Sequence, residues 1–114
     1  MNTTFEALVD PTRRHILDLL RERPRLVGEL VDTLKMSQPG ISKHLRVLRE
    51  AGLVSVRQDA QRRWYELRTE PLEEVDAWLE PFRQAMEARY ERLDELLERL
   101  QQEEKHDEQD ESDR

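Results

Sequence analysis

A cluster of polar and cationic side chains recurs along residues 37–52 and could bind nucleic acid. Its members are Ser42, Lys43, Arg46 and Arg49. Hydroxyl, ammonium and guanidinium groups are the donors with which proteins bind DNA phosphates and base edges. Ser42 and His44 lie close together, but no carboxylate stands near them to orient a nucleophile. The chain also has no Gly-rich phosphate loop and no cofactor motif. We therefore expect a binding protein and not an enzyme.

One short helix is predicted to position this cluster. Ile41, Leu45 and Leu48 recur at i, i+4 and i+7 and form an apolar stripe on another face. Ser37 is placed as the N-cap, and Gly52 stands where a left-handed residue ends a helix. A buried stripe with a cationic outer face fits a helix that enters the DNA major groove. It also fits a solvated amphipathic helix, so the window alone does not decide.

Two longer helical segments are predicted before this helix, after a short helix around Phe5, Leu8 and Val9. Asp10 and Pro11 mark the N-cap and first position of the first segment, which ends at Pro24. We expect its inward residues to be Ile16, Leu19 and Leu20 and its outward residues to be Arg13, Arg14 and Asp18. Residues 26–34 form the second segment, and the short connection at residues 35–36 makes a helix-turn-helix with residues 37–51.

The periodicity changes to that of strands after Gly52. Two strands are predicted at residues 53–58 and 62–68, with a polar turn between them. Arg57, Arg62 and Arg63 surround this turn. A basic hairpin that follows a helix-turn-helix favours a wing, which contacts a phosphate backbone or the minor groove. A surface hairpin with solvated arginines is the alternative.

A heptad-like apolar seam runs through residues 71–101. Its residues, which we assign to a dimer interface, are Val75, Trp78, Leu79, Phe82, Met86, Tyr90, Leu93, Leu97 and Leu100, and Leu96 widens it. A winged domain of about 70 residues is too small to cover so long a seam, so we expect a homodimer; an intramolecular packing helix is the alternative. Pro81 predicts a break near residues 78–81, with a short helix before it and a long one after it.

Charge separates the same regions. Residues 1–70 hold 13 Lys and Arg against 10 Asp and Glu, whereas residues 71–114 hold 6 against 16. Within residues 35–63 the net charge is +5, so the chain is basic around the candidate reading helix although its total is -7. We expect a winged domain at residues 1–70, dimerisation helices at 71–101 and a disordered acidic tail at 102–114, because the tail lacks apolar residues.

Composition excludes several other classes of protein. The chain has no cysteine, so disulfides and thiolate metal sites are excluded. It shows no signal peptide and no apolar run of the roughly 20 residues that a membrane span needs. We therefore expect a cytoplasmic protein that does not contact membranes.

The strings DPTRRHILDLLRE, VGELVDTLKMSQPGISKHLRVLREAGLV and RRWYEL resemble the ArsR/SmtB family of bacterial winged-helix repressors. The resemblance covers residues 5–68. It implies a mainly α fold with a small β-hairpin, a long C-terminal dimerisation helix, and a homodimer that binds a palindromic operator in double-stranded DNA through residues 37–51 and the wing at 57–63. The DNA contacts that it implies, together with the exposed arginines, are Ser37, Gln38, Pro39, Gly40, Ser42, Lys43, His44, Arg46, Arg49, Arg57, Arg62 and Arg63. For His44, packing against the helix-turn-helix core is the alternative.

The sensor ligands of metal-binding family members do not carry over. The stretch that holds a Cys-x-Cys pair in those members is LVGEL here, and residues 71–100 contain no histidine. We expect neither a metal nor another cofactor, and the residues leave open whether a small-molecule effector exists. A winged helix that binds another protein through the acidic C-terminal region is the alternative function; it gives no reason for the arginines to concentrate on the helix and wing.

Overall fold

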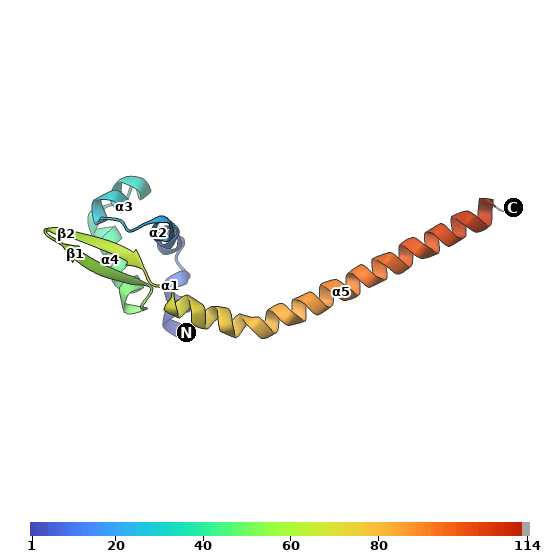
Figure 1. Cartoon of the computed structure of the whole chain (residues 1–114). Coiled ribbons are helices and arrows are strands. Elements are labelled where there is room, and N and C mark those ends of the chain that lie inside the picture. Colours follow the sequence, from blue (N-terminus) through green and yellow to red (C-terminus); the bar gives the residue numbers. More distant parts are fainter. Residues whose placement is uncertain (113–114) are drawn as a thin grey trace. The chain divides into compact units, whose positions relative to one another are not determined.

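The computed structural model describes the backbone of residues 1–112 and the side chains of residues 1–108. Its elements are α1 (Asn2–Leu8), α2 (Pro11–Glu22), α3 (Val27–Leu34), α4 (Gln38–Glu50), β1 (Val54–Asp59), β2 (Arg62–Leu67) and α5 (Glu70–Ser112) (Figure 1). This order confirms the expected class, which is a mainly α winged helix-turn-helix with one hairpin and a long C-terminal helix. The chain divides into two compact units, Met1–Ala77 and Trp78–Arg114. The first unit extends past the boundary expected at residue 70, because Leu72 packs against its core.

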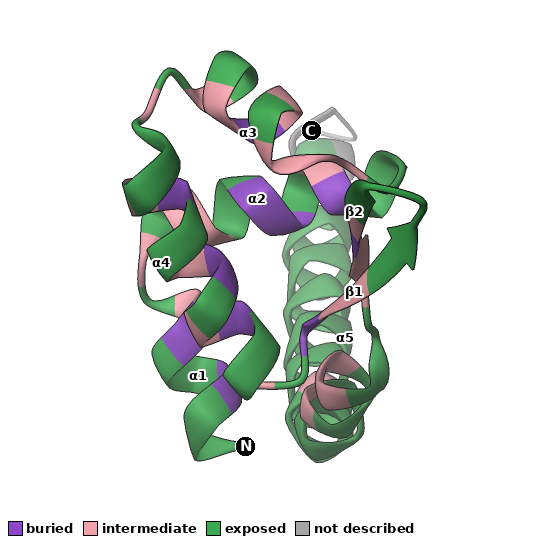
Figure 2. Ribbon diagram, turned by 90° about the vertical axis from the view of Figure 1, so that its left-hand side faces the viewer, coloured by how far each residue is buried: buried purple, intermediate pink, exposed green. Residues whose placement is uncertain are grey.

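The core of the first unit forms where the apolar stripes of its helices meet. Figure 2 shows buried positions on α1, α2, α3 and α4 and at the base of the hairpin. The fully or nearly buried residues are Ala7, Ile16, Leu17, Leu20, Leu30, Ile41, Leu45, Leu48, Leu53, Val54 and Tyr65. The stripe predicted for α4 is confirmed. On α2 the third buried residue is Leu17, and Leu19 is only partly buried.

Local signals in the sequence set the boundaries of α2 and α4. The Asp10 carboxylate accepts hydrogen bonds from the amides of Thr12 and Arg13, at 2.8 and 3.2 Å, and Pro11 occupies the first helical position. Ser37 caps α4, because its Oγ accepts a hydrogen bond from the Gly40 amide at 3.2 Å. Both caps satisfy amides that the first turn of a helix leaves without an intrahelical partner.

The turn between α3 and α4 contains no glycine. Lys35 follows α3 in the left-handed conformation, with φ 53° and ψ 46°. A left-handed residue after a helix reverses the chain within a few residues, and glycine is the usual choice there because it has no Cβ. The connection therefore keeps its short length at the cost of a backbone conformation that lysine adopts less readily.

Gly52 ends α4 as the sequence predicts. Its φ is +76°, and a Cβ on it would lie 3.5 Å from the Pro71 ring. The chain then enters β1, which pairs with β2 in an antiparallel register that places Val54 opposite Leu67 and Asp59 opposite Arg62. The hairpin is therefore joined to α4 by a turn that needs glycine for its backbone conformation.

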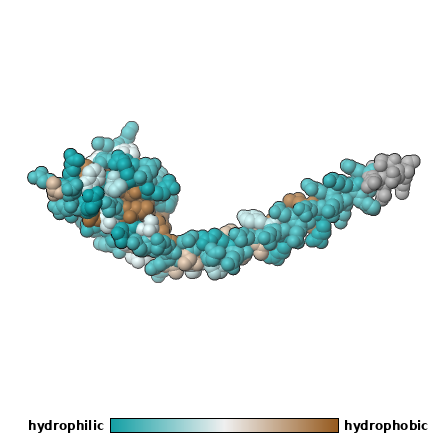
Figure 3. Space-filling model, viewed as in Figure 1, coloured by the Kyte–Doolittle hydropathy of each residue, from teal (hydrophilic) through white to brown (hydrophobic). Residues whose placement is uncertain are grey.

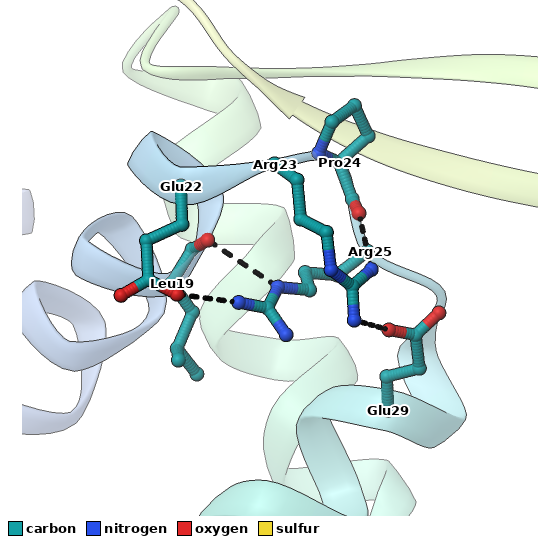
Figure 4. Close-up of polar contacts among 6 residues, drawn as sticks. All are labelled: Leu19, Glu22, Arg23, Pro24, Arg25 and Glu29. Carbon is teal, nitrogen blue, oxygen red and sulfur yellow. Dashed lines mark hydrogen bonds and ion pairs between the residues drawn. The ribbon is translucent and has the colours of Figure 1, made fainter.

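The segment between α2 and α3 also pairs with the hairpin, which the sequence did not predict. Arg25 and Tyr65 exchange both backbone hydrogen bonds, at 3.0 and 2.8 Å. The Arg25 side chain bonds the Leu19 carbonyl and the Glu22 carboxylate, while Arg23 bonds the Pro24 carbonyl and Glu29 (Figure 4). These contacts hold residues 23–25 against α2 and α3, and Arg25 of the same segment pairs with β2 of the hairpin.

Helix α5 differs from the prediction in two ways. It runs without interruption through Pro81, so the predicted break into two helices is wrong. A proline removes one backbone hydrogen bond, and the helix-forming residues on both sides continue the helix. The predicted disorder of residues 102–114 is also wrong as far as Ser112, because α5 continues to that residue. Residues 113–114 lie outside the described part of the chain.

The acidic segment can be helical because helix formation is limited by nucleation. The seam residues before Leu100 already belong to α5, so each further residue adds one hydrogen bond without a new nucleation cost. Glutamate, glutamine and lysine are also good helix formers. The lack of apolar side chains in this segment predicts disorder, because the segment cannot form a core. The same lack does not stop an existing helix from continuing through it.

Candidate nucleic-acid interface

The outer face of α4 is polar, cationic and open to solvent. Ser37, Gln38, Pro39, Ser42, Lys43, Arg46 and Arg49 are all exposed, and Gly40 is half-buried. Because Ile41, Leu45 and Leu48 anchor the opposite face in the core, the backbone of α4 is held rigidly beneath these side chains. The predicted contacts therefore share one accessible surface, apart from His44, which lies on the flank that faces α1 and α2.

The positive charges of this surface are largely uncompensated. Within the described part of the chain, Lys43, Arg46, Arg62 and Arg63 make no ion pair or side-chain hydrogen bond. Arg57 differs, because its Nε lies 2.7 Å from Oε1 of Glu66 on the neighbouring strand. Cations without a protein partner are available to phosphates, so Arg62 and Arg63 are better placed for this than Arg57.

An open groove runs between α4 and the wing. It has a volume of about 630 Å³ and is lined by Arg46, Arg49, Glu50, Val54, Ser55 and Val56. Its cationic wall belongs to α4 and its apolar and hydroxyl-bearing wall belongs to β1. The two arginines of this groove supply donors of the kind that bind phosphates.

His44, which lies on α4, contacts an arginine of α2. Nη1 of Arg13 lies 3.4 Å from Nδ1 of His44. The helical pattern predicts that Arg13 faces solvent. The structure contradicts this, because Arg13 is half-buried and its Nε donates a hydrogen bond to the Ala7 carbonyl at 2.7 Å. This contact was missed because it joins side chains 31 residues apart, and helical periodicity does not report such pairs.

The Asp10 carboxylate lies in the same region. Partial desolvation acts to raise its pKa, but hydrogen bonds from the amides of Arg13 and Thr12 outweigh this effect. The nearby positive charge on Arg13, and on His44 when it is protonated, acts in the same direction, so the pKa of Asp10 lies below its ordinary value. The carboxylate therefore stays charged and keeps its cap bonds at neutral pH.

The apolar seam on α5 is exposed from Trp78 onward. The exposed seam residues are Trp78, Leu79, Phe82, Met86, Tyr90, Leu93, Leu96, Leu97 and Leu100. Val75 is instead half-buried and belongs to the first unit. Figure 3 shows hydrophobic residues interrupting the hydrophilic surface of α5. Phe5 and Val9, at α1 and its C-terminal end, are exposed as well.

The described residues show neither a metal site nor a membrane span. Among them, no group of three or more His, Asp or Glu side chains is placed to hold a metal ion. No helix in the described part of the chain is both long and apolar enough to cross a bilayer.

Comparison with known proteins identifies the family. Residues 10–56 match the model of the bacterial regulatory protein, arsR family. The transcriptional repressor SdpR of Bacillus subtilis is 38% identical over 79 residues, which are 69% of this chain and 88% of SdpR. This chain belongs to the ArsR family. It is accordingly a DNA-binding transcriptional regulator with a winged helix-turn-helix.

Other ArsR-family proteins support the same assignment. The arsenic resistance transcriptional regulator ArsR1 of Pseudomonas putida is 45% identical over 76 residues, covering 66% of this chain and 59% of that protein. The solved structure of an ArsR-like transcriptional regulator from Rhodococcus sp. RHA1 matches with a TM-score of 0.70 and 27% identity, covering 85% of this chain and 89% of that one. These relatives are transcriptional regulators, which form a non-enzymatic family.

Proposed function

We propose that the protein is a homodimeric repressor that binds a palindromic operator in double-stranded DNA through two copies of α4 and two wings. In each protomer, α4 occupies the major groove and Arg62 and Arg63 contact the adjacent backbone. The observation that carries the proposal is the set of exposed, unpaired cations on the outer face of α4 and at the hairpin tip. We place this activity in the cytoplasm, where the chromosomal DNA of bacteria lies.

Each side chain on α4 has a chemical role that fits this geometry. Gln38 can form paired hydrogen bonds with adenine, and Arg46 can do so with guanine or a phosphate. Ser37 and Ser42 offer hydroxyls to phosphates or base edges, and Lys43 offers a point charge. The side chains suited to base edges and those suited to phosphates therefore lie on the same exposed face of α4.

The exposed seam on α5 supports the dimer. Phe82 is 51% exposed and Tyr90 is 62% exposed, although large apolar side chains normally gain from leaving water. The centroids of the Trp78 and Phe82 rings also lie 4.9 Å apart, so the two rings form one broad apolar surface. A second copy of α5 has a seam of the same pattern, and an isologous contact covers both at once. A two-fold dimer then presents its reading helices to successive major grooves, about 34 Å apart.

Charge-removal variants test the reading face. We expect Lys43→Ala and Arg46→Ala to weaken binding to a duplex recovered by selection from genomic DNA. Both should leave the dimer and its helical circular dichroism signal intact. Each lost phosphate contact should also reduce the slope of log affinity against log salt by about 1. Gel-shift titrations over a series of salt concentrations measure both effects.

Lys105→Ala is the matched control, because it removes the same charge from an exposed position on α5. It should leave affinity and salt slope close to those of the wild type. Unchanged affinity in both Lys43→Ala and Arg46→Ala would refute the assignment of α4 as the reading helix.

A further inference from the structure

The Arg13 side chain touches three helices at once. Arg13 lies in the first turn of α2. Its Nε donates to the Ala7 carbonyl at 2.7 Å and its Nη2 donates to the Glu6 carbonyl at 3.0 Å. The remaining nitrogen, Nη1, lies 3.4 Å from Nδ1 of His44 on α4. A single planar group therefore links α1, α2 and the reading helix.

Two of the three guanidinium nitrogens are held by backbone carbonyls. The carbonyls of Glu6 and Ala7 belong to the end of α1, where the last carbonyls of a helix lack intrahelical partners. Ala7 is fully buried, so the backbone that holds Nε is part of the core. Arginine presents its donors in a fixed fork, and two anchored donors therefore fix the direction of the third.

The third donor constrains the role that Nδ1 of His44 can take in this contact. Arginine is always protonated and can only donate, so Nδ1 of His44 must be an acceptor in this contact. An imidazole whose Nδ1 accepts carries its proton on Nε2 and is neutral. Nε2–H is then the donor that the ring can offer to another group. Because His44 is only half-buried, this donor can reach an acceptor outside the protein.

We propose that Arg13 is a positioning residue for DNA binding, which holds His44 in the tautomer whose Nε2–H donates to a DNA phosphate at the edge of the reading face. The inference rests on the proposed role of α4 as the reading helix. It combines the two sequence-based interpretations of His44, since the ring packs against α2 through one nitrogen and contacts DNA through the other.

The experiment measures the affinity for the selected duplex by fluorescence anisotropy in the wild type, in His44→Ala, in Arg13→Lys and in the double variant. His44→Ala removes the Nε2–H donor and should weaken binding. His15→Ala removes an exposed histidine on α2 and should bind like the wild type. Wild-type affinity in His44→Ala would overturn the proposal.

Arg13→Lys tests the positioning directly. Lysine keeps the charge but cannot hold two carbonyls and the imidazole in one plane. We expect affinity about tenfold below that of the wild type, as for the loss of one charged hydrogen bond. Because Arg13 acts through His44, adding His44→Ala should cause no further loss. Wild-type affinity in Arg13→Lys, or losses that add in the double variant, would contradict the inference. If Arg13→Lys does not fold, the affinity of His44→Ala decides.

The outcomes separate this inference from the proposed function. If Lys43→Ala binds as tightly as the wild type, the assignment of the reading face fails. If Lys43→Ala loses affinity while Arg13→Lys and His44→Ala bind like the wild type, the reading face stands and only the role of Arg13 fails.

Discussion

Truncating one leucine of the α5 seam should weaken the dimer by an amount that the structure sets. Leu97 is 56% exposed in the single chain, so a partner can cover about half of its surface. Fully burying a leucine contributes roughly 1.5–3 kcal/mol, and half of that is about 1 kcal/mol per side chain. In a symmetric dimer both copies of Leu97 lose this contribution. We therefore expect Leu97→Ala to cost about 2 kcal/mol and to raise the dimer dissociation constant about 30-fold.

Sedimentation equilibrium over a range of protein concentrations measures this constant. Glu95→Ala is the matched control, because residue 95 lies on α5 two positions away, is exposed, and stands on the helix face opposite the seam. It should leave the dissociation constant unchanged. A dimer of wild-type affinity in Leu97→Ala, or an equal loss in Glu95→Ala, would refute the view that this seam holds two copies together.

Two further predictions concern the wing and the cap of α2. The double variant Arg62→Ala/Arg63→Ala should weaken binding to specific and non-specific duplexes alike and reduce the salt slope by about 2; anisotropy titrations showing a wild-type slope would contradict a phosphate role. Asp10→Ala should lower the thermal midpoint at neutral pH. Because the pKa of Asp10 is lowered by folding, its contribution is present above the unfolded-state pKa and is lost as the pH falls through the folded one. The thermal midpoints of the wild type and Asp10→Ala, measured by circular dichroism, should therefore converge at acid pH. A difference between the two midpoints that stays constant with pH would contradict this.

Local chemistry made much of the winged domain predictable. The caps at Asp10 and Ser37 act within three residues, and the spacing of Ile41, Leu45 and Leu48 shows which face of α4 is buried. The left-handed residue Gly52 was recognisable from its place after the last turn of α4. Each of these features depends on residues close together in sequence, so a pattern within one window carries the information.

Contacts between distant residues were not predictable in the same way. The pairing of Arg25 with Tyr65 and the contact of Arg13 with His44 join residues from different elements. Nothing in the periodicity of either element identifies its partner. Arg13 in particular occupies an outward-facing position in the pattern of α2, and it is held inward because the end of α1 supplies carbonyls that need donors.

The full length of α5 could not be predicted from composition, because composition indicates whether a segment can form a core and not whether an existing helix continues into it. Acidic composition without apolar residues indicates that a segment cannot form a core, and this argued for disorder after residue 101. A segment that continues an existing helix needs no core and no nucleation. The local cost of Pro81 likewise predicts a break, but helix-forming residues on both sides keep α5 continuous.

Hydroxyl-radical footprinting of the wild-type protein on a selected duplex tests the central claim most directly. If two copies of α4 read DNA across a two-fold axis, the footprint should show two protected segments. They should be related by a palindrome and lie about 34 Å apart along one face of the duplex. A single protected segment, or two segments at a spacing that varies between selected sequences, would contradict a dimer that places two copies of α4 in successive major grooves.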